Sequence, residues 1–173
     1  MRERFLAYGN YRLGSTGVRT VDWDSESGCL RLIDQRLLPG ELRVAVFCDY
    51  RQVVAAIQEM VVRGAPAIGV TAAFGMALAA RQSEAQDVPA LQRDLAVAGE
   101  ALIGARPTAV NLRWAVNRIW RLCTQPGADT NELRRLALEE ARRLADEDVA
   151  INRQMAMHGA GLIQADAAIA ATP

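Results

Sequence analysis

The 173-residue sequence contains no lysine, and all 20 of its basic residues are arginine. Without lysine the chain cannot form a lysine Schiff base or carry the lysine of a phosphate-binding P-loop. Codon bias explains this absence more simply than function does. The 20 acidic residues bring the net charge to zero, which gives no electrostatic reason to expect a general nucleic-acid or membrane-surface binder.

Histidine and cysteine are also scarce. The only histidine is His158, and Cys29, Cys48 and Cys123 form no CxxC pair, so a zinc site is not expected. The opening stretch MRERFLAYGN lacks the apolar core of a signal peptide, so we expect a reducing cytoplasm and three free thiols. The most apolar run, 65–80, is short for a membrane span and favours a buried helix.

Residues 18–48 have the pattern of strands. Alternating or continuous apolar residues predict strands at 18–23, 29–33 and 43–48, separated by the turn clusters DSESG and LLPG. Connections this short favour an antiparallel meander. Residues 1–16 are polar and contain glycine, which predicts an irregular arm.

The pattern becomes helical from Asp49 onward. Its periodicity predicts helices over 49–62, 66–81, 88–103, 109–123 and 131–158. Asp49, Thr108 and Thr130 are candidate caps of three of them, Pro66 is placed to open another, and Gly159 is the candidate stop of the last.

Two of these helices have unusual features. In the helix from Pro66, Gly69, Ala72, Ala73 and Gly75 leave little bulk, so we expect a neighbouring backbone to come close. In the last helix, the spacing predicts a buried stripe formed by Leu133, Ala137, Ala141, Leu144, Ile151 and Met155.

Asp148 lies within that stripe. A buried carboxylate must be paired or hydrogen-bonded, so Asp148 is either a polar tie between helices or a catalytic group, and the tie is the simpler interpretation. On the outer surface of the same helix, Glu139 and Arg143 are spaced for an ion pair.

Two arginines precede prolines at breaks before helices: Arg63 in RGAP and Arg106 in ARPT. A helix that begins at Pro66 has free amides and the positive end of its dipole near Arg63. Gly64 lets a ligand approach the backbone, and a guanidinium matches a phosphate in geometry. Two such arginines could converge on one phosphate, or each could be an ordinary surface charge.

Four stretches decide between these interpretations: LRLIDQRLLP (30–39), MVVRGAPAIGVTAAFGMALA (60–79), ARPTAVNLRWAVNR (105–118) and EDVAINRQMAMHGAGLI (147–163). In sequence and order they resemble the N-terminal half of 5-methylthioribose-1-phosphate isomerases, over residues 18–163. The wider superfamily includes ribose-1,5-bisphosphate isomerase and regulatory subunits of the translation-initiation nucleotide-exchange factor. The LIDQRLLP stretch favours the methylthioribose branch.

The resemblance implies an α+β fold, with a small N-terminal antiparallel meander followed by a helical bundle, and a Rossmann-like domain after it. It implies a homodimer that isomerises a sugar phosphate in methionine salvage without metal or organic cofactor. It assigns substrate binding to Arg63, Gly64, Ala65 and Arg106. We expect no nucleic-acid or membrane partner.

The sequence departs from the family pattern where the catalytic cysteine is expected. The THCN-like segment is replaced by AAIAATP at the end of the sequence, and none of the three cysteines matches the catalytic position. We therefore expect residues 1–48 to form an arm and small sheet, 49–163 a helical domain, and 164–173 the truncated start of the missing α/β domain. Such a chain would be inactive alone, because it lacks the acid and base of an aldose–ketose isomerisation.

Two other functions fit the same residues. A regulatory module related to the exchange-factor subunits would bind a sugar phosphate, a nucleotide or a protein without needing the cysteine. A purely structural dimerisation domain would use the helices between 49 and 158, and neither Arg63 nor Arg106 would matter for its binding.

Overall fold

The computed structural model describes residues 7–9 and 19–165. Four short strands precede five helices, which confirms the predicted α+β class. The strands are β1 (Ala7–Gly9), β2 (Val21–Asp24), β3 (Cys29–Ile33) and β4 (Val44–Phe47). The helices are α1 (Tyr50–Gln58), α2 (Ala65–Gln82), α3 (Val88–Ala105), α4 (Val110–Cys123) and α5 (Thr130–Ala165).

The strands form one antiparallel sheet in the order β1-β4-β3-β2. Strands β2, β3 and β4 are the predicted meander. The first turn closes with a hydrogen bond from Gly28 N to Asp24 O (2.8 Å), and Gly28 has a φ of 66°. Strand β1 lies within the predicted arm and was not expected, and the other residues of that arm, 1–6 and 10–16, lie outside the described part.

Cys29 and Cys48 form a disulfide, so the prediction of three free thiols is wrong for this pair. In the β3–β4 register Leu30 lies opposite Phe47, which brings Cys29 and Cys48 face to face with their Cα atoms 4.5 Å apart. That separation is within the range of a disulfide. The pairing depends on strand register, and cysteine spacing alone does not reveal it.

Helix boundaries follow the predicted caps in part. Asp49 caps α1 as predicted, in a capping box with Gln52, but the helix ends at Gln58 rather than near residue 62, and Met60 has a φ of 61°. The predicted caps Thr108 and Thr130 are wrong. Helix α4 follows Ala109 without a side-chain cap, and the Asp129 carboxylate accepts from Glu132 N (2.8 Å) at the start of α5.

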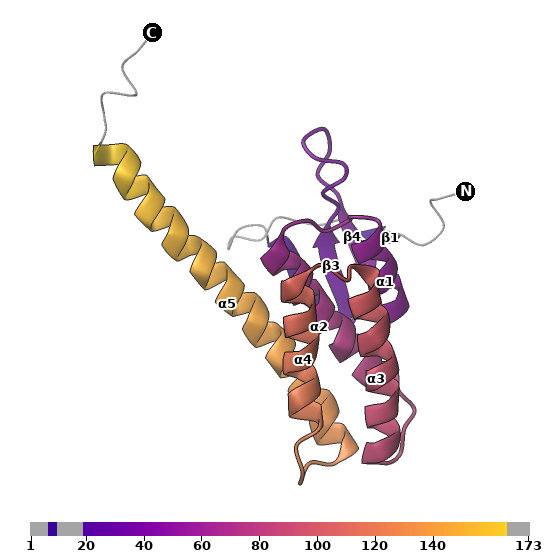
Figure 1. Cartoon of the computed structure of the whole chain (residues 1–173). Helices are drawn as coiled ribbons and strands as arrows, with labels where there is room; N and C mark the ends of the chain where they lie inside the picture. Colours follow the sequence, from indigo (N-terminus) through magenta and orange to yellow (C-terminus); the bar gives the residue numbers. More distant parts are fainter. Residues whose placement is uncertain (1–6, 10–18, 166–173) are drawn as a thin grey trace.

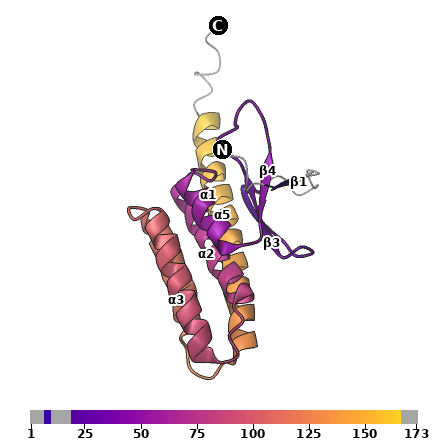
Figure 2. The same ribbon diagram turned by 90° about the vertical axis from the view of Figure 1, so that its right-hand side faces the viewer.

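Helix α2 is the central element of the bundle. Every residue from Ile68 to Ala80 is buried, and α2 contacts the other four helices as well as β2 and β3. Figure 1 shows α1, α3, α4 and α5 arranged around it, and Figure 2 shows α1, α3 and α5 beside it in a second view. A Cβ atom placed on Gly69 would lie 2.9 Å from the backbone oxygen of Asn111 in α4, which confirms the predicted close approach of a neighbouring backbone.

Helix α5 has 36 residues, twice the length of α2 and α3. Its first half packs on the bundle through Leu133, Ala137, Ala141 and Leu144, as predicted. Its second half extends beyond the bundle (Figure 1). Ile151 and Met155 are 55% and 57% exposed, so their predicted burial is wrong, and the helix continues through the predicted stop at Gly159.

Asp148 is not buried either, because it lies where α5 leaves the bundle. It is half-buried, and its carboxylate accepts from Asn152 Nδ2 one turn later (3.0 Å). The predicted tie between helices is absent from the described contacts of this side chain, and nothing in its surroundings indicates catalysis.

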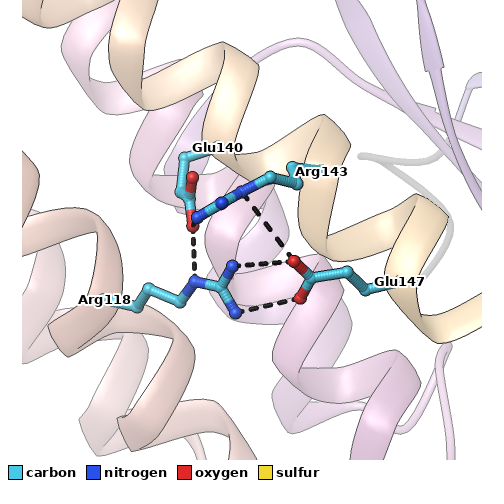
Figure 3. Close-up of polar contacts among 4 residues, drawn as sticks. All are labelled: Arg118, Glu140, Arg143 and Glu147. Carbon is cyan, nitrogen blue, oxygen red and sulfur yellow. Dashed lines mark hydrogen bonds and ion pairs between the residues drawn. The ribbon is translucent and has the colours of Figure 1, made fainter.

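A charged cluster joins α4 to α5 instead (Figure 3). Arg118 of α4 makes two hydrogen bonds of 3.0 Å to the Glu147 carboxylate and one to Glu140. Glu140 is buried, and Arg143 also bonds to it (2.6 Å). Burial alone would raise the pKa of Glu140, but the bonds from Arg143 and Arg118 outweigh it and lower that pKa. The expected Glu139–Arg143 pair is wrong, since Glu139 pairs with Arg135 (2.6 Å).

Among the described helices, α2 included, none has both the length and the apolar character required to span a membrane.

The contact between Gly69 and Asn111 predicts a stability effect. Replacing Gly69 with alanine forces α2 and α4 apart and should lower the free energy of unfolding by about 1–3 kcal/mol. The matched control is Gly159→Ala in α5, where no atom lies within 4 Å of the added Cβ and alanine should gain up to about 1 kcal/mol. Urea unfolding of the three proteins measures both changes. Equal stabilities for Gly69→Ala and the unchanged protein would contradict this packing.

Candidate anion-binding site

The two predicted arginine breaks lie at the same end of the bundle. Helix α2 begins there, α3 ends there and α4 begins there, at the upper end of the bundle in Figure 1. Two contacts fix this arrangement: Arg106 Nη1 lies 2.6 Å from Met60 Sδ in the α1–α2 connection, and Gly69 in the second turn of α2 adjoins Asn111 of α4.

Gly64 is the N-cap of α2, with a φ of 91° and a ψ of 133°. This backbone conformation suits glycine because it has no Cβ, and no atom lies within 4 Å of the position a Cβ would take. The side of the backbone that carries the missing Cβ is therefore open to a ligand.

The first turn of α2 supplies free donors. The first helical hydrogen bond runs from Ile68 N to Gly64 O (3.0 Å), so the amides of Ala65 and Ala67 have no partner within the helix. Pro66 lies in this turn and costs nothing there, because its missing N–H would be unsatisfied anyway. The helix begins at Ala65, one residue before the predicted start, and its positive end faces the surface.

Arg63 directly precedes this turn and is exposed. Its backbone is held from the β3–β4 loop, where Gln35 Nε2 donates to Arg63 O (3.5 Å) and Gln35 N donates to Val61 O (2.9 Å). Within the described residues its guanidinium makes no hydrogen bond or ion pair. The Arg63 side chain is therefore available for a ligand while its backbone is fixed.

Arg106 is the C-cap of α3 and is half-buried. Its guanidinium reaches Met60 Sδ, and a thioether is only a weak acceptor. Most of its five donors therefore remain for an anion. The contact shows that the side chain is directed toward the connection that carries Arg63.

The carboxylates of Asp34 and Glu59 do not neutralise these two arginines, because both are paired with Arg36. It bonds to Asp34, which is fully buried, with a shortest contact of 2.7 Å, and to Glu59 at 2.9 Å. The charge-assisted bond to Asp34 raises the pKa of Arg36 further above its usual range. The bridge also joins the β3–β4 loop to the end of α1, and so supports the connection that leads to Arg63.

The predicted site residues Arg63, Gly64, Ala65 and Arg106 thus share one end of the molecule, and their geometry fits an anion. Sequence reasoning placed Met60 in the buried stripe of the 49–62 helix, whereas it lies beyond the end of α1. It gave Gln35, Arg36 and Met60 no part in the site, although they hold the loops around it. Gln35 and Arg36 lie in LIDQRLLP, one of the stretches that carried the family resemblance, so a signal for them was present.

Comparison with known proteins agrees with this resemblance. Residues 61–172 match the Initiation factor 2 subunit family. The chain belongs to this family. It is 48% identical to the methylthioribose-1-phosphate isomerase of Synechococcus sp., over 78% of this chain and 38% of that protein. It is 44% identical to a putative methylthioribose-1-phosphate isomerase of Pyrococcus horikoshii, over 84% of this chain and 40% of that protein.

Two solved structures are also similar. The translation initiation factor eIF-2B subunit delta from A. fulgidus has a TM-score of 0.77 at 41% identity, over 84% of this chain and 42% of that one. The 5-methylthioribose 1-phosphate isomerase from Pyrococcus horikoshii OT3 has a TM-score of 0.76 at 40% identity, over 88% and 43%. The chain spans about two fifths of the length of the relatives it matches.

Two hollows lie away from the arginines. One of about 410 Å³ lies between β2 and the middle of α5, and we call it the α5 groove; it is lined by Arg19, Thr20, Val21, Val70, Ala145, Asp148, Val149, Asn152, Arg153 and Ala156. The other, of about 190 Å³, adjoins Trp23 and Phe74. Neither of these two hollows is lined by Arg63 or Arg106.

Candidate catalytic groups do not accompany the arginines. Cys29 and Cys48 are oxidised to a disulfide, and Cys123 is buried at the end of α4, the far end from Arg106. Burial raises the pKa of the Cys123 thiol to about 11, which makes it a poor nucleophile near neutral pH. Among the described residues, no group of three metal-ligating side chains could hold an ion.

The state of the cysteines can be tested by alkylation. At pH 8 the folded chain should react with iodoacetamide at none of its three cysteines, because two are bonded and the Cys123 thiol is buried and protonated. After unfolding in urea one cysteine should react, and after reduction all three. Mass spectrometry counts the added groups. Rapid alkylation of Cys123 in the folded protein would contradict its burial.

Proposed function

We propose that this chain is the phosphate-anchoring part of an isomerase that converts 5-methylthioribose 1-phosphate to 5-methylthioribulose 1-phosphate. The observation that carries the proposal is the Arg106–Met60 contact, which brings the second arginine break against the connection that bears Arg63. The names of the relatives support the choice of substrate. Such an enzyme belongs to methionine salvage, and we extend the proposal to a cytoplasmic homodimer.

Each proposed site residue has a defined role. The amides of Ala65 and Ala67, the dipole of α2 and the Arg63 guanidinium would hold the phosphate, and Arg106 would contact it from the end of α3. Gly64 would let the phosphate reach the backbone. Binding of the phosphate by these groups would orient the sugar and restrict its motion. Positioning of this kind contributes to catalysis.

The proton or hydride transfer of an aldose–ketose isomerisation needs an acid and a base beside the sugar. The described carboxylates Asp34 and Glu59, which lie in or beside the adjoining loops, are both bound to Arg36. We therefore assign the chemistry to parts of such an enzyme outside residues 19–165. No metal or organic cofactor is required by this proposal.

A regulatory module is the second candidate. The solved eIF-2B delta subunit is as similar in structure as the isomerase, with TM-scores of 0.77 and 0.76. A module of that kind would bind a sugar phosphate or nucleotide at the same arginines without turnover. An assay of ligand conversion by the complete gene product would distinguish the two functions, because only the isomerase would convert the ligand.

Removing either arginine should weaken ligand binding. Arg63→Ala and Arg106→Ala should each reduce the affinity for 5-methylthioribose 1-phosphate by about 1.5–3 kcal/mol, since each removes a hydrogen bond between charged groups. Isothermal titration calorimetry measures this. The matched control is Arg121→Ala, which removes an exposed arginine at the opposite end of α4 and should leave binding unchanged. Unaltered binding in both site variants would favour the structural dimerisation domain and exclude this site.

The chain alone should bind without turnover. With the protein at a concentration comparable to that of the substrate, proton NMR of 5-methylthioribose 1-phosphate should show no ketose above the buffer control. Formation of 5-methylthioribulose 1-phosphate by this chain would mean that its own residues supply the acid and base, and our assignment of the chemistry would be wrong.

A further inference from the structure

Met60 has a backbone conformation that glycine usually adopts. It follows the end of α1 with a φ of 61°. Two hydrogen bonds close the turn there, one from its own amide to Ile57 O (3.3 Å) and one from Val61 N to Ala56 O (2.9 Å). These bonds form a Schellman motif, whose left-handed residue is most often glycine because a Cβ is disfavoured there. A long side chain kept at such a position points to a role for that side chain.

The Met60 side chain is directed to Arg106. Its Sδ lies 2.6 Å from Arg106 Nη1, although 46 positions separate the two residues in the sequence. A thioether is a weak hydrogen-bond acceptor, so the contact orients the guanidinium without satisfying it, and a phosphate can compete for the same donors. Met60 is half-buried rather than enclosed, so small solutes in the solvent can reach it.

A thioether in this position is open to oxidation by a hydroperoxide. A lone pair of the sulfur attacks one peroxide oxygen, the O–O bond breaks and an S–O bond forms. The departing hydroxide takes the proton of the transferred oxygen and leaves as water. The sulfur is oxidised by two electrons and the peroxide is reduced by two, and methionine becomes methionine sulfoxide.

The sulfoxide oxygen would change the contact with Arg106. It is a polar acceptor where the thioether was a weak one, and its hydrogen bond with a guanidinium is charge-assisted and therefore strong. The oxygen would compete with a phosphate for the donors of Arg106. The Arg63 guanidinium and the free amides of α2 would remain available, so binding would weaken rather than disappear.

We propose that Met60 is a modification site, at which reversible oxidation to the sulfoxide by a hydroperoxide lowers the affinity of the arginine site for its phosphate ligand. The proposal rests on the proposed function, because it acts through Arg106. The other described methionines are differently placed: Met76 is fully buried in α2, and Met155 and Met157 lie exposed on the second half of α5. Methionine sulfoxide reductases remove the oxygen again, which makes the effect reversible.

Calorimetry before and after treatment with hydrogen peroxide tests the proposal. Mass spectrometry should locate one added oxygen on Met60. The affinity of the oxidised chain for 5-methylthioribose 1-phosphate should fall about fivefold or more, since part of the contribution of Arg106 is lost, and methionine sulfoxide reductases should restore it. Met60→Leu should bind equally before and after treatment. The matched control Met157→Leu removes an exposed methionine and should lose affinity on treatment as the unchanged chain does.

A second variant shows whether the effect passes through Arg106. In Arg106→Ala, peroxide should cause no further loss of affinity, because the group that the sulfoxide would bind is gone. A general disturbance of the fold would weaken this variant and the unchanged chain alike. In the ligand-free chain, oxidation should shift the NMR signals of the Arg106 guanidinium more than those of Arg121, which lies at the opposite end of α4.

The outcomes separate this proposal from the proposed function. Unchanged affinity in a chain whose Met60 is fully oxidised would overturn the proposal and leave the proposed function standing. Resistance of Met60 to peroxide while Met157 is oxidised would do the same, as would an equal loss of affinity in Met60→Leu. Absence of binding by the unoxidised chain would instead refute the proposed function, and this proposal with it.

Discussion

The close packing around α2 is the constraint on which the rest of the structure depends. Its residues from Ile68 to Ala80 are all buried, and small side chains allow the other helices to approach. At Gly69 the backbone of α4 comes so near that no side chain fits between them. Interiors packed at this density transmit displacement rather than absorb it. The start of α2 is therefore held rigidly, and its free amides are presented at a fixed place beside the ends of α3 and α4.

In this chain without lysine, arginine side chains join loops and helices to one another. The forked guanidinium can satisfy several acceptors at once. Arg134 donates to the carbonyls of Ala80, Ser83 and Ala85 at distances of 2.8–3.2 Å, and so closes the last turn of α2. Arg36 and Arg118 likewise join loops and helices through two carboxylates each. Because these arginines are engaged, Arg63 and Arg106 differ from them in keeping donors for a ligand.

Local signals predicted the local structure. Asp49 caps α1, Pro66 lies in the first turn of α2, and Gly69 of α2 receives a neighbouring backbone. The wrong cap at α5 has a local cause, because the neighbouring Asp129 accepts the hydrogen bond that was expected for Thr130. The Cys29–Cys48 bond and strand β1 depend on sheet register, which a single sequence does not display. The stripe of α5 was predicted correctly as far as Leu144, but periodicity does not show where a helix leaves the bundle, and Ile151 and Met155 are exposed.

The candidate site was predicted through the combination of motif and helix physics. The motifs RGAP and ARPT identified the site residues, and the fold brought their helix ends together. Gln35, Arg36 and Met60 could not be assigned to the site, because their contacts link segments far apart in sequence.

One measurement tests the account most directly: a two-dimensional amide NMR titration of the isotope-labelled chain with 5-methylthioribose 1-phosphate. The account predicts the largest shifts at the amides of Gly64, Ala65 and Ala67 and at the Arg63 and Arg106 side chains. An unchanged spectrum, or shifts confined to the α5 groove, would contradict it.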